Sequence, residues 1–157
     1  DFESDHPLAG IEFQRRWESL AFRVGGGDYQ APVQLLADFL NDQAGTGPGA
    51  VPATYRPGVR PAELKKCLPL HVVMMLREAV PQLDHKLRGF ALPEAILTGV
   101  ETRSSSPVRL ERDESFQSNI RGLYPAGEGP GYAGGIVSSA VDGIKVAEAI
   151  TGRYKPL

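Results

Sequence analysis

The stretch "GEGPGYAGG", residues 127–135, separates a short apolar run from a helical pattern, and five of its nine residues are glycine. The run before it, "RGLYPAGE" (121–128), is predicted to form a short strand that ends in glycine. The residues after it, "IVSSAVDGIKVAEAITG" (136–152), are predicted to form an amphipathic helix. We expect its polar stripe to contain Ser138, Asp142, Lys145 and Glu148, and its buried stripe Val137, Ala140, Val141, Ile144 and Ala147.

A glycine-rich turn that leads into a helix is suited to binding an anionic or electron-rich ligand. Glycine permits positive backbone φ angles and lets a ligand approach the main chain closely. The start of the helix presents unpaired N–H groups and the positive end of the helix dipole. Small residues there (Gly134, Gly135 and Ser138) leave room for a bulky group. Either a pyrophosphate or the edge of a flavin ring would suit such a site.

Three interpretations of this loop are open. Gly129, Gly131 and Gly134 match the G-x-G-x-x-G pattern of a Rossmann dinucleotide site. That site requires a second strand with an acidic residue about 20 positions further on, and no acidic residue follows Glu148, so we expect the match to be accidental. A loop without a ligand is disfavoured, because ordering five glycines costs much conformational entropy. A flavin-contacting loop is the third interpretation.

The amino-acid composition restricts the class of protein. The chain has 157 residues, a net charge of −2 and 41% hydrophobic residues, which is typical of one globular domain. No basic excess indicates nucleic acid, no apolar run is long enough to span a membrane, and one cysteine, Cys67, excludes a disulfide framework. We expect a cytoplasmic protein. The polar start "DFESDHPLAG" lacks an initiator methionine, so a fragment of a longer protein is expected, with a trimmed terminus as the alternative.

The sequence predicts an α+β fold with a mainly helical first hundred residues. Helices are expected at about 10–24, ended by Gly25-Gly26-Gly27, and from Ala31-Pro32 to before Gly45. A Gly/Pro-rich connection covers 45–61, a short helix opens at Pro61, and another opens at Pro69 and is interrupted at Pro81. Short strands are expected at 94–101 and 107–112. We expect residues 1–93 to form a helical substrate or cap region, and residues 94–157 to form strands with the flavin-contacting loop and helix.

Nearly the whole chain resembles a family of uncharacterised NAD(P)/FAD-dependent oxidoreductases (dehydrogenases). The most specific part of the resemblance is "GLYPAGEGPGYAGGIVSSAVDGIKVAEAI" (122–150). "GIEFQRRWESLAFRVGGGDYQAPVQLLADFL", "YRPGVRPAEL" and "ILTGVETRSSSPVRLERDESFQS" extend it upstream. The resemblance implies a C-terminal fragment of a larger FAD/NAD(P)-binding fold, whose partner is the missing N-terminal FAD-binding half. It implies FAD as cofactor, NAD(P)H as a possible electron donor and an unknown small-molecule substrate. The alternative is a non-enzymatic helical domain for protein interaction.

The resemblance also implies roles for individual residues. Glu128 would bond the ribityl part of FAD, with the amides of Gly127 and Gly129 against the pyrophosphate–ribityl portion. Tyr132 would pack on the ring, or else would serve as a simple packing anchor. The N–H groups of three residues would face the flavin N1–C2=O edge: Gly134, Gly135 and Ile136.

A second candidate is "TRSSSPVR" (102–109), which the resemblance places near the flavin. Its candidate contacts to flavin or substrate are Arg103, Ser104, Ser105 and Ser106, and the alternative is a polar turn between two strands. No acid/base pair identifies catalytic residues, and no histidine pair has the spacing of metal ligands. Cys67 has no C-x-x-C partner and is expected to be structural.

Overall fold

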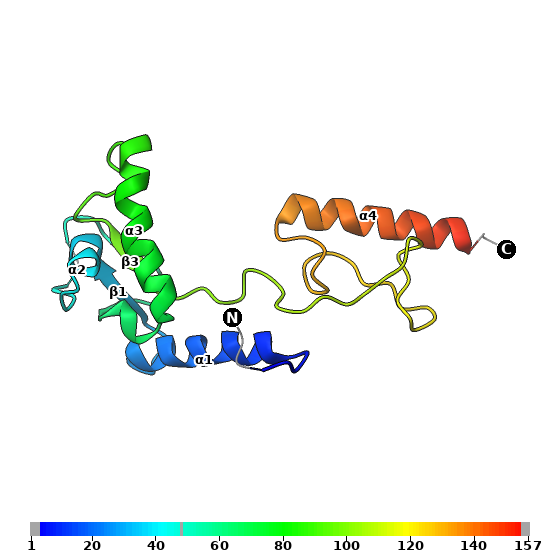
Figure 1. Ribbon diagram of the computed structural model, residues 1–157, viewed down its shortest axis with the longest axis horizontal. Coiled ribbons are helices and arrows are strands. Elements are labelled where there is room, and N and C mark those ends of the chain that lie inside the picture. The colour runs from blue at the N-terminus through cyan, green and yellow to red at the C-terminus, as the bar shows by residue number, and fades with distance from the viewer. Residues whose placement is uncertain (1–3, 48, 155–157) are drawn as a thin grey trace. The chain divides into compact units, whose positions relative to one another are not determined.

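The computed structural model describes residues 4–47 and 49–154 (Figure 1). Over this range it shows four α-helices and one three-stranded sheet, so the predicted α+β class is confirmed. The three strands lie within residues 31–98, however, and do not follow a mainly helical first hundred residues. The chain divides into two compact units. We call Arg15–Glu101 the sheet unit, and Asp1–Gln14 with Thr102–Leu157 the loop unit. This division does not test the predicted regions 1–93 and 94–157, which stay a prediction.

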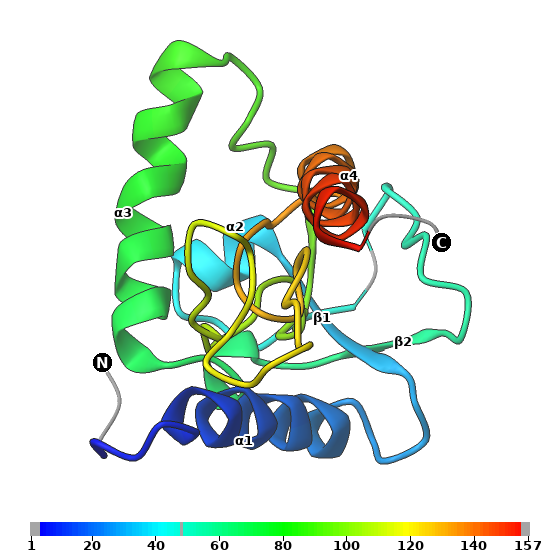
Figure 2. The ribbon, with the colours of Figure 1, turned by 90° about the vertical axis from the view of Figure 1, so that its right-hand side faces the viewer.

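The sheet unit is built around β1 (Ala31–Leu35), where the sequence predicted a helix. β1 is the central strand: it pairs in parallel with β2 (Val59–Pro61) and antiparallel with β3 (Ile96–Thr98). Figure 2 shows β1 and β2 running side by side. The helix was predicted because the fixed φ of Pro32 favours the first turn of a helix. In the structure, the Pro32 carbonyl instead accepts the Gly99 N–H at 2.9 Å. Pairing on both edges outweighs this local preference.

Helices enclose the core of the sheet unit. α1 (Ala9–Val24) confirms the first predicted helix, and its glycine stop is required, because a side chain at Gly25 would clash with the Gln30 carbonyl oxygen. α2 (Leu36–Leu40) follows β1 directly and buries Phe39 to 1% exposure. η1 (Leu64–Lys66), a 3-10 helix, replaces the short helix expected from Pro61. The core consists of Ala21, Phe39, Leu64, Cys67 and Val73.

α3 (Leu70–Lys86) runs through Pro81 without the predicted interruption. A proline inside a helix removes one backbone hydrogen bond and costs about 3 kcal/mol. Val73 and Val80 are buried on the inner face of α3, and their burial offsets much of that cost. The helix therefore stays continuous because tertiary packing outweighs the local effect of proline.

In the loop unit, the chain from Thr102 is irregular up to the glycine-rich loop and runs beside α4 (Ile136–Arg153) (Figure 1). The helix itself was predicted correctly, but residues 107–112 and 121–128 are not strands. They lack a partner strand in the described chain and make only isolated bonds, such as Leu110 N–H to the Pro130 carbonyl. The buried stripe of α4 was also wrong, since Val137, Val141 and Ile144 are exposed. The better-covered positions are Ser139, Asp142, Gly143, Val146, Ala149 and Ile150.

None of the helices among the described residues is long and apolar enough to cross a membrane. Residues 4–47 and 49–154 also contain no group of three or more histidine, cysteine, aspartate or glutamate side chains placed to hold a metal ion.

Candidate functional site

The glycine-rich loop, residues 127–135, is fixed at its first residue. Gly127 is buried with φ +77°, and its N–H donates a 2.8 Å hydrogen bond to Oδ2 of Asp142 in α4. Its carbonyl accepts the Tyr132 N–H, and the Glu128 carbonyl accepts the Gly131 N–H. The loop therefore starts as a compact turn against α4, with the amide of Gly127 already bonded within the protein.

The structure brings the serine turn, residues 103–106, together with the glycine-rich loop. The Ser106 hydroxyl lies 2.8 Å from the carbonyl oxygens of Gly129 and Val108, to either of which it can donate. Ser105 Oγ lies 3.9 Å from the position that a Cβ on Gly134 would occupy. Two candidate segments that are about 25 residues apart in the sequence thus lie side by side. Ser104 and Arg103 are exposed within the same turn.

Close approach explains a further glycine of this loop. Gly131 has φ +83°, and a Cβ there would lie 2.7 Å from the carbonyl oxygen of Val108. Such a contact is closer than real side chains tolerate, and the backbone conformation also favours glycine. By contrast, a Cβ at Gly129 would meet no atom within 4 Å. Close packing and a positive φ therefore require glycine at position 131, whereas packing does not require it at position 129.

An ion pair that the sequence did not predict holds the loop to α4. Both terminal nitrogens of Arg112 contact Asp142: Nη2 to Oδ1 at 2.6 Å and Nη1 to Oδ2 at 3.0 Å. Nη1 also donates to the Pro125 carbonyl at 2.7 Å. The two side chains are only 8% and 14% exposed. The pair thus joins the segment after the serine turn, the entry to the loop and the middle of α4.

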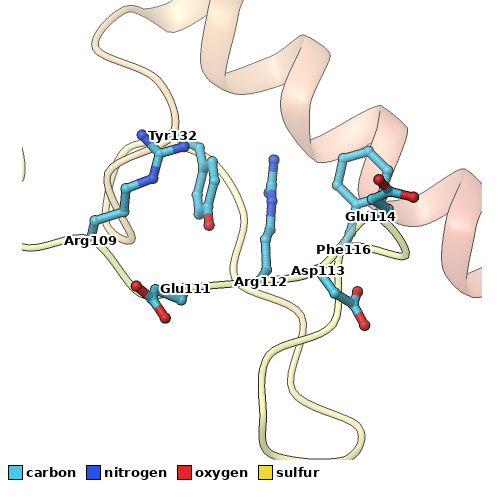
Figure 3. Close-up of a pocket in the computed structure, with 7 residues that line it drawn as sticks. All are labelled: Arg109, Glu111, Arg112, Asp113, Glu114, Phe116 and Tyr132. Atoms are coloured by element: carbon cyan, nitrogen blue, oxygen red, sulfur yellow. The ribbon is translucent and has the colours of Figure 1, made fainter.

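Aromatic rings enclose the guanidinium of this ion pair (Figure 3). The Arg112 guanidinium lies 3.6 Å from the ring centre of Tyr132 and 4.7 Å from that of Phe116. Arg109 covers the other face of Tyr132 at 4.3 Å. Stacking of this kind stabilises a cation most when water is excluded. The four side chains border an open depression of about 600 Å³.

Tyr132 makes contacts through both faces of its ring and through its hydroxyl. Both ring faces carry a guanidinium, and its hydroxyl donates to the Leu110 carbonyl at 3.0 Å. These contacts are those of a packing anchor, which was one of the two interpretations of this residue. Its contact with a flavin ring stays a prediction.

The electrostatics of the ion pair are strongly coupled. The Arg112 guanidinium, followed by the Gly127 N–H, lowers the pKa of Asp142 from 3.8 to about 2. In turn, the hydrogen bond to Asp142 raises the pKa of Arg112. Both groups are therefore charged at any pH at which the protein is expected to work.

The start of α4 is open. Ile136 is 92% exposed, and Gly134 and Gly135 are exposed beside it. Ser138 Oγ accepts the Gly135 N–H at 3.1 Å, whereas the N–H groups of Gly134 and Ile136 have no hydrogen-bond partner in the described part of the chain. An open depression of about 760 Å³ borders this helix start, between Tyr132 and Lys145.

Glu128, in the first turn of the glycine-rich loop, is half-buried. Its carboxylate makes no ion pair or hydrogen bond to any residue of 4–47 or 49–154. The two free amides at the helix start, together with the Ser105 hydroxyl near Gly134, can donate hydrogen bonds to an acceptor-rich ligand. The site contains no nucleophile paired with a base.

Sequence comparison supports the FAD-dependent part of the resemblance described above. Residues 1–104 match the family "FAD-dependent protein, C-terminal domain-like", a match that includes Arg103 and Ser104 and ends before the glycine-rich loop. An uncharacterised protein of Clostridium beijerinckii is 55% identical over 155 residues, which is 98% of this chain and 29% of that protein. The chain therefore spans less than a third of the length of this relative. By its sequence, the chain belongs to the FAD-dependent protein, C-terminal domain-like family.

Proposed function

We propose that this chain is the C-terminal part of an FAD-dependent oxidoreductase and supplies the wall of the site at the edge of the flavin ring. The observation that carries the proposal is the open start of α4: two amides without partners, no Cβ at Gly134, and Ser105 alongside. Membership of an FAD-dependent family supplies the class of cofactor. The longer relative is consistent with a further region that would bind the rest of the cofactor.

The residues present fit such a group. The N–H groups of Gly134 and Ile136 would hold negative charge at the flavin N1–C2=O edge, where a helix start contributes about 0.3–1 kcal/mol, or more when partly buried. Gly135 would act through its position, because Ser138 already accepts its N–H. Glu128 would bond the ribityl hydroxyls, and Ser105 would approach the ring from the serine turn. FAD would supply transfer of a hydride or an electron pair.

Three other predicted residues would support the loop. The Gly127 N–H is already bonded to Asp142, and the Ser106 hydroxyl is already bonded to the carbonyl of Gly129 or Val108. Gly129 has open space around it and would face the pyrophosphate–ribityl portion of FAD. The electron donor, for which the resemblance offers NAD(P)H, and the substrate would be bound by other parts of the protein. We propose a cytoplasmic enzyme.

The exposed apolar face of α4 would be covered in the longer protein. Ile136, Val137, Val141 and Ile144 form this face, and each is more than 40% exposed. A face of this kind on a helix usually marks an interaction surface. We propose that the N-terminal FAD-binding region of the same protein packs there.

The proposal is tested by Gly134→Val in the full-length protein. Gly134 is exposed, has no positive φ, and its Cβ would meet only Ser105 Oγ, at 3.9 Å, so the substitution should leave folding nearly unchanged. It would fill the space beside the helix start, and flavin occupancy should fall at least about tenfold, which corresponds to about 1.4 kcal/mol. Gly152→Val, at the far end of α4 with open space around it, is the matched control. Equal flavin content in both variants would contradict the loop assignment.

A non-enzymatic interaction domain is the second candidate, favoured by the exposed Leu70, Met74 and Met75 of α3. Adaptable methionine-rich surfaces are common where a protein binds partners. A full-length protein that carries no flavin and still captures a partner through this surface would favour this candidate over the oxidoreductase.

A further inference from the structure

The Arg112–Asp142 ion pair lies directly behind the proposed flavin contacts. Asp142 bonds the N–H of Gly127, and Arg112 bonds the carbonyl of Pro125, two residues earlier. The next residue after Gly127 is Glu128, whose carboxylate is free for a ligand. Every displacement of the Gly127 peptide would therefore move Glu128 and Gly129, the residues that the proposed function places against the ribityl chain.

Stability alone is a poor explanation for such a pair. Burying two charges costs more free energy than packing apolar side chains of similar size, and a buried pair is better suited to fixing one geometry. The described part of α4 has just one buried apolar residue, Val146, so its inner face depends on polar contacts. The planar Arg112 fork contacts both carboxylate oxygens while Tyr132 and Phe116 hold its faces. A guanidinium that is bound at its edge and at both faces has little freedom to move.

We propose that Asp142, fixed by Arg112, is the positioning residue of the cofactor-binding loop, and presets the Gly127 peptide in its binding geometry before FAD arrives. This inference rests on the proposed function. Preorganisation of this kind raises affinity because the loop does not have to be ordered when the ligand binds. Asp142 itself touches no cofactor in this account, since both of its oxygens are already bonded.

The test compares Asp142→Asn with Glu148→Gln in the full-length protein. Glu148 is an exposed carboxylate on the same helix and serves as the matched control. In the flavin-stripped protein, hydrogen exchange of the Gly127 amide should rise at least about tenfold in Asp142→Asn and stay unchanged in Glu148→Gln. FAD should then bind about tenfold more weakly to Asp142→Asn only.

Two further measurements separate positioning from a general loss of structure. At saturating FAD, the visible absorption spectrum of Asp142→Asn should differ from that of the parent protein, because Glu128 and Gly129 would lie differently against the cofactor. Arg112→Lys keeps the charge but not the two-oxygen contact, and should give the same changes with a smaller loss of thermal stability than Asp142→Asn. It keeps the test informative if Asp142→Asn fails to fold.

The outcomes are distinct. Faster Gly127 exchange together with weaker FAD binding would support the proposal. Unchanged exchange in both Asp142→Asn and Arg112→Lys, or faster exchange with unchanged FAD affinity and spectrum, would overturn it while leaving the proposed function intact. A parent protein that binds no FAD would overturn the proposed function itself, and the exchange result would still show whether Asp142 orders the loop.

Discussion

The ion pair between Arg112 and Asp142 makes the loop unit sensitive to acid in a predictable range. Hydrogen bonds from Arg112 and then Gly127 lower the pKa of Asp142 from 3.8 to about 2. Since a tenfold change in proton affinity corresponds to about 1.4 kcal/mol, this lowering contributes about 2 kcal/mol to stability when the carboxylate is ionised. The contribution is fully present above the unfolded pKa and is lost as the pH falls through the folded pKa.

We therefore predict that the loop unit loses about 2 kcal/mol of unfolding free energy between about pH 5 and about pH 2 through Asp142 alone. The assay is a urea titration at each pH, followed by NMR signals of the α4 amides and compared with Asp142→Asn. Asp113, in the same unit, also has a lowered pKa, through hydrogen bonds led by Ser115. It contributes equally to both proteins and cancels in the difference. Parallel pH profiles for the two proteins would refute the reasoning.

Two further predictions concern single residues. Gly131→Ala should destabilise the loop unit by more than about 1 kcal/mol, because φ is +83° and its Cβ would lie 2.7 Å from the Val108 oxygen. Gly129→Ala, with open space around it, should change stability by less than about 0.5 kcal/mol; equal effects in urea titrations would contradict this account of the loop. The buried Cys67 thiol, whose pKa burial raises to about 11, should react with a thiol reagent far more slowly in native protein than in urea. Equal rates would show that Cys67 is accessible.

Local sequence patterns predicted the elements that depend on local interactions. α1 and α4 have helical periodicity and glycine at an end, and both helices are present. β1 was mistaken for a helix because its strand identity depends on pairing with β2 and β3, which are distant in sequence. Residues 107–112 alternate like a strand, yet this segment is held by side-chain contacts, such as Arg109 on Tyr132 and Arg112 with Asp142, and not by strand pairing. Periodicity alone does not distinguish these causes.

The candidate site was predictable in part. Glycine and serine clusters singled out residues 103–106 and 127–135, which the structure brings together through Ser106 and Gly129. The Arg112–Asp142 pair was missed, since 30 residues separate its members and Asp142 fits the polar stripe of a solvated helix. The predicted buried face of α4 was wrong for a related reason: the covered positions include a serine, an aspartate and a glycine, whereas Ile136, Val137, Val141 and Ile144 are exposed. An exposed apolar face cannot be told from a buried one by sequence when its partner is another part of the protein.

The flavin content of the purified full-length protein tests the central claim most directly. Our account predicts that the protein carries FAD in stoichiometric amount, seen as the visible absorption bands of oxidised flavin and as FAD released on denaturation. A protein that is colourless, releases no FAD and takes up none when FAD is added would contradict the account.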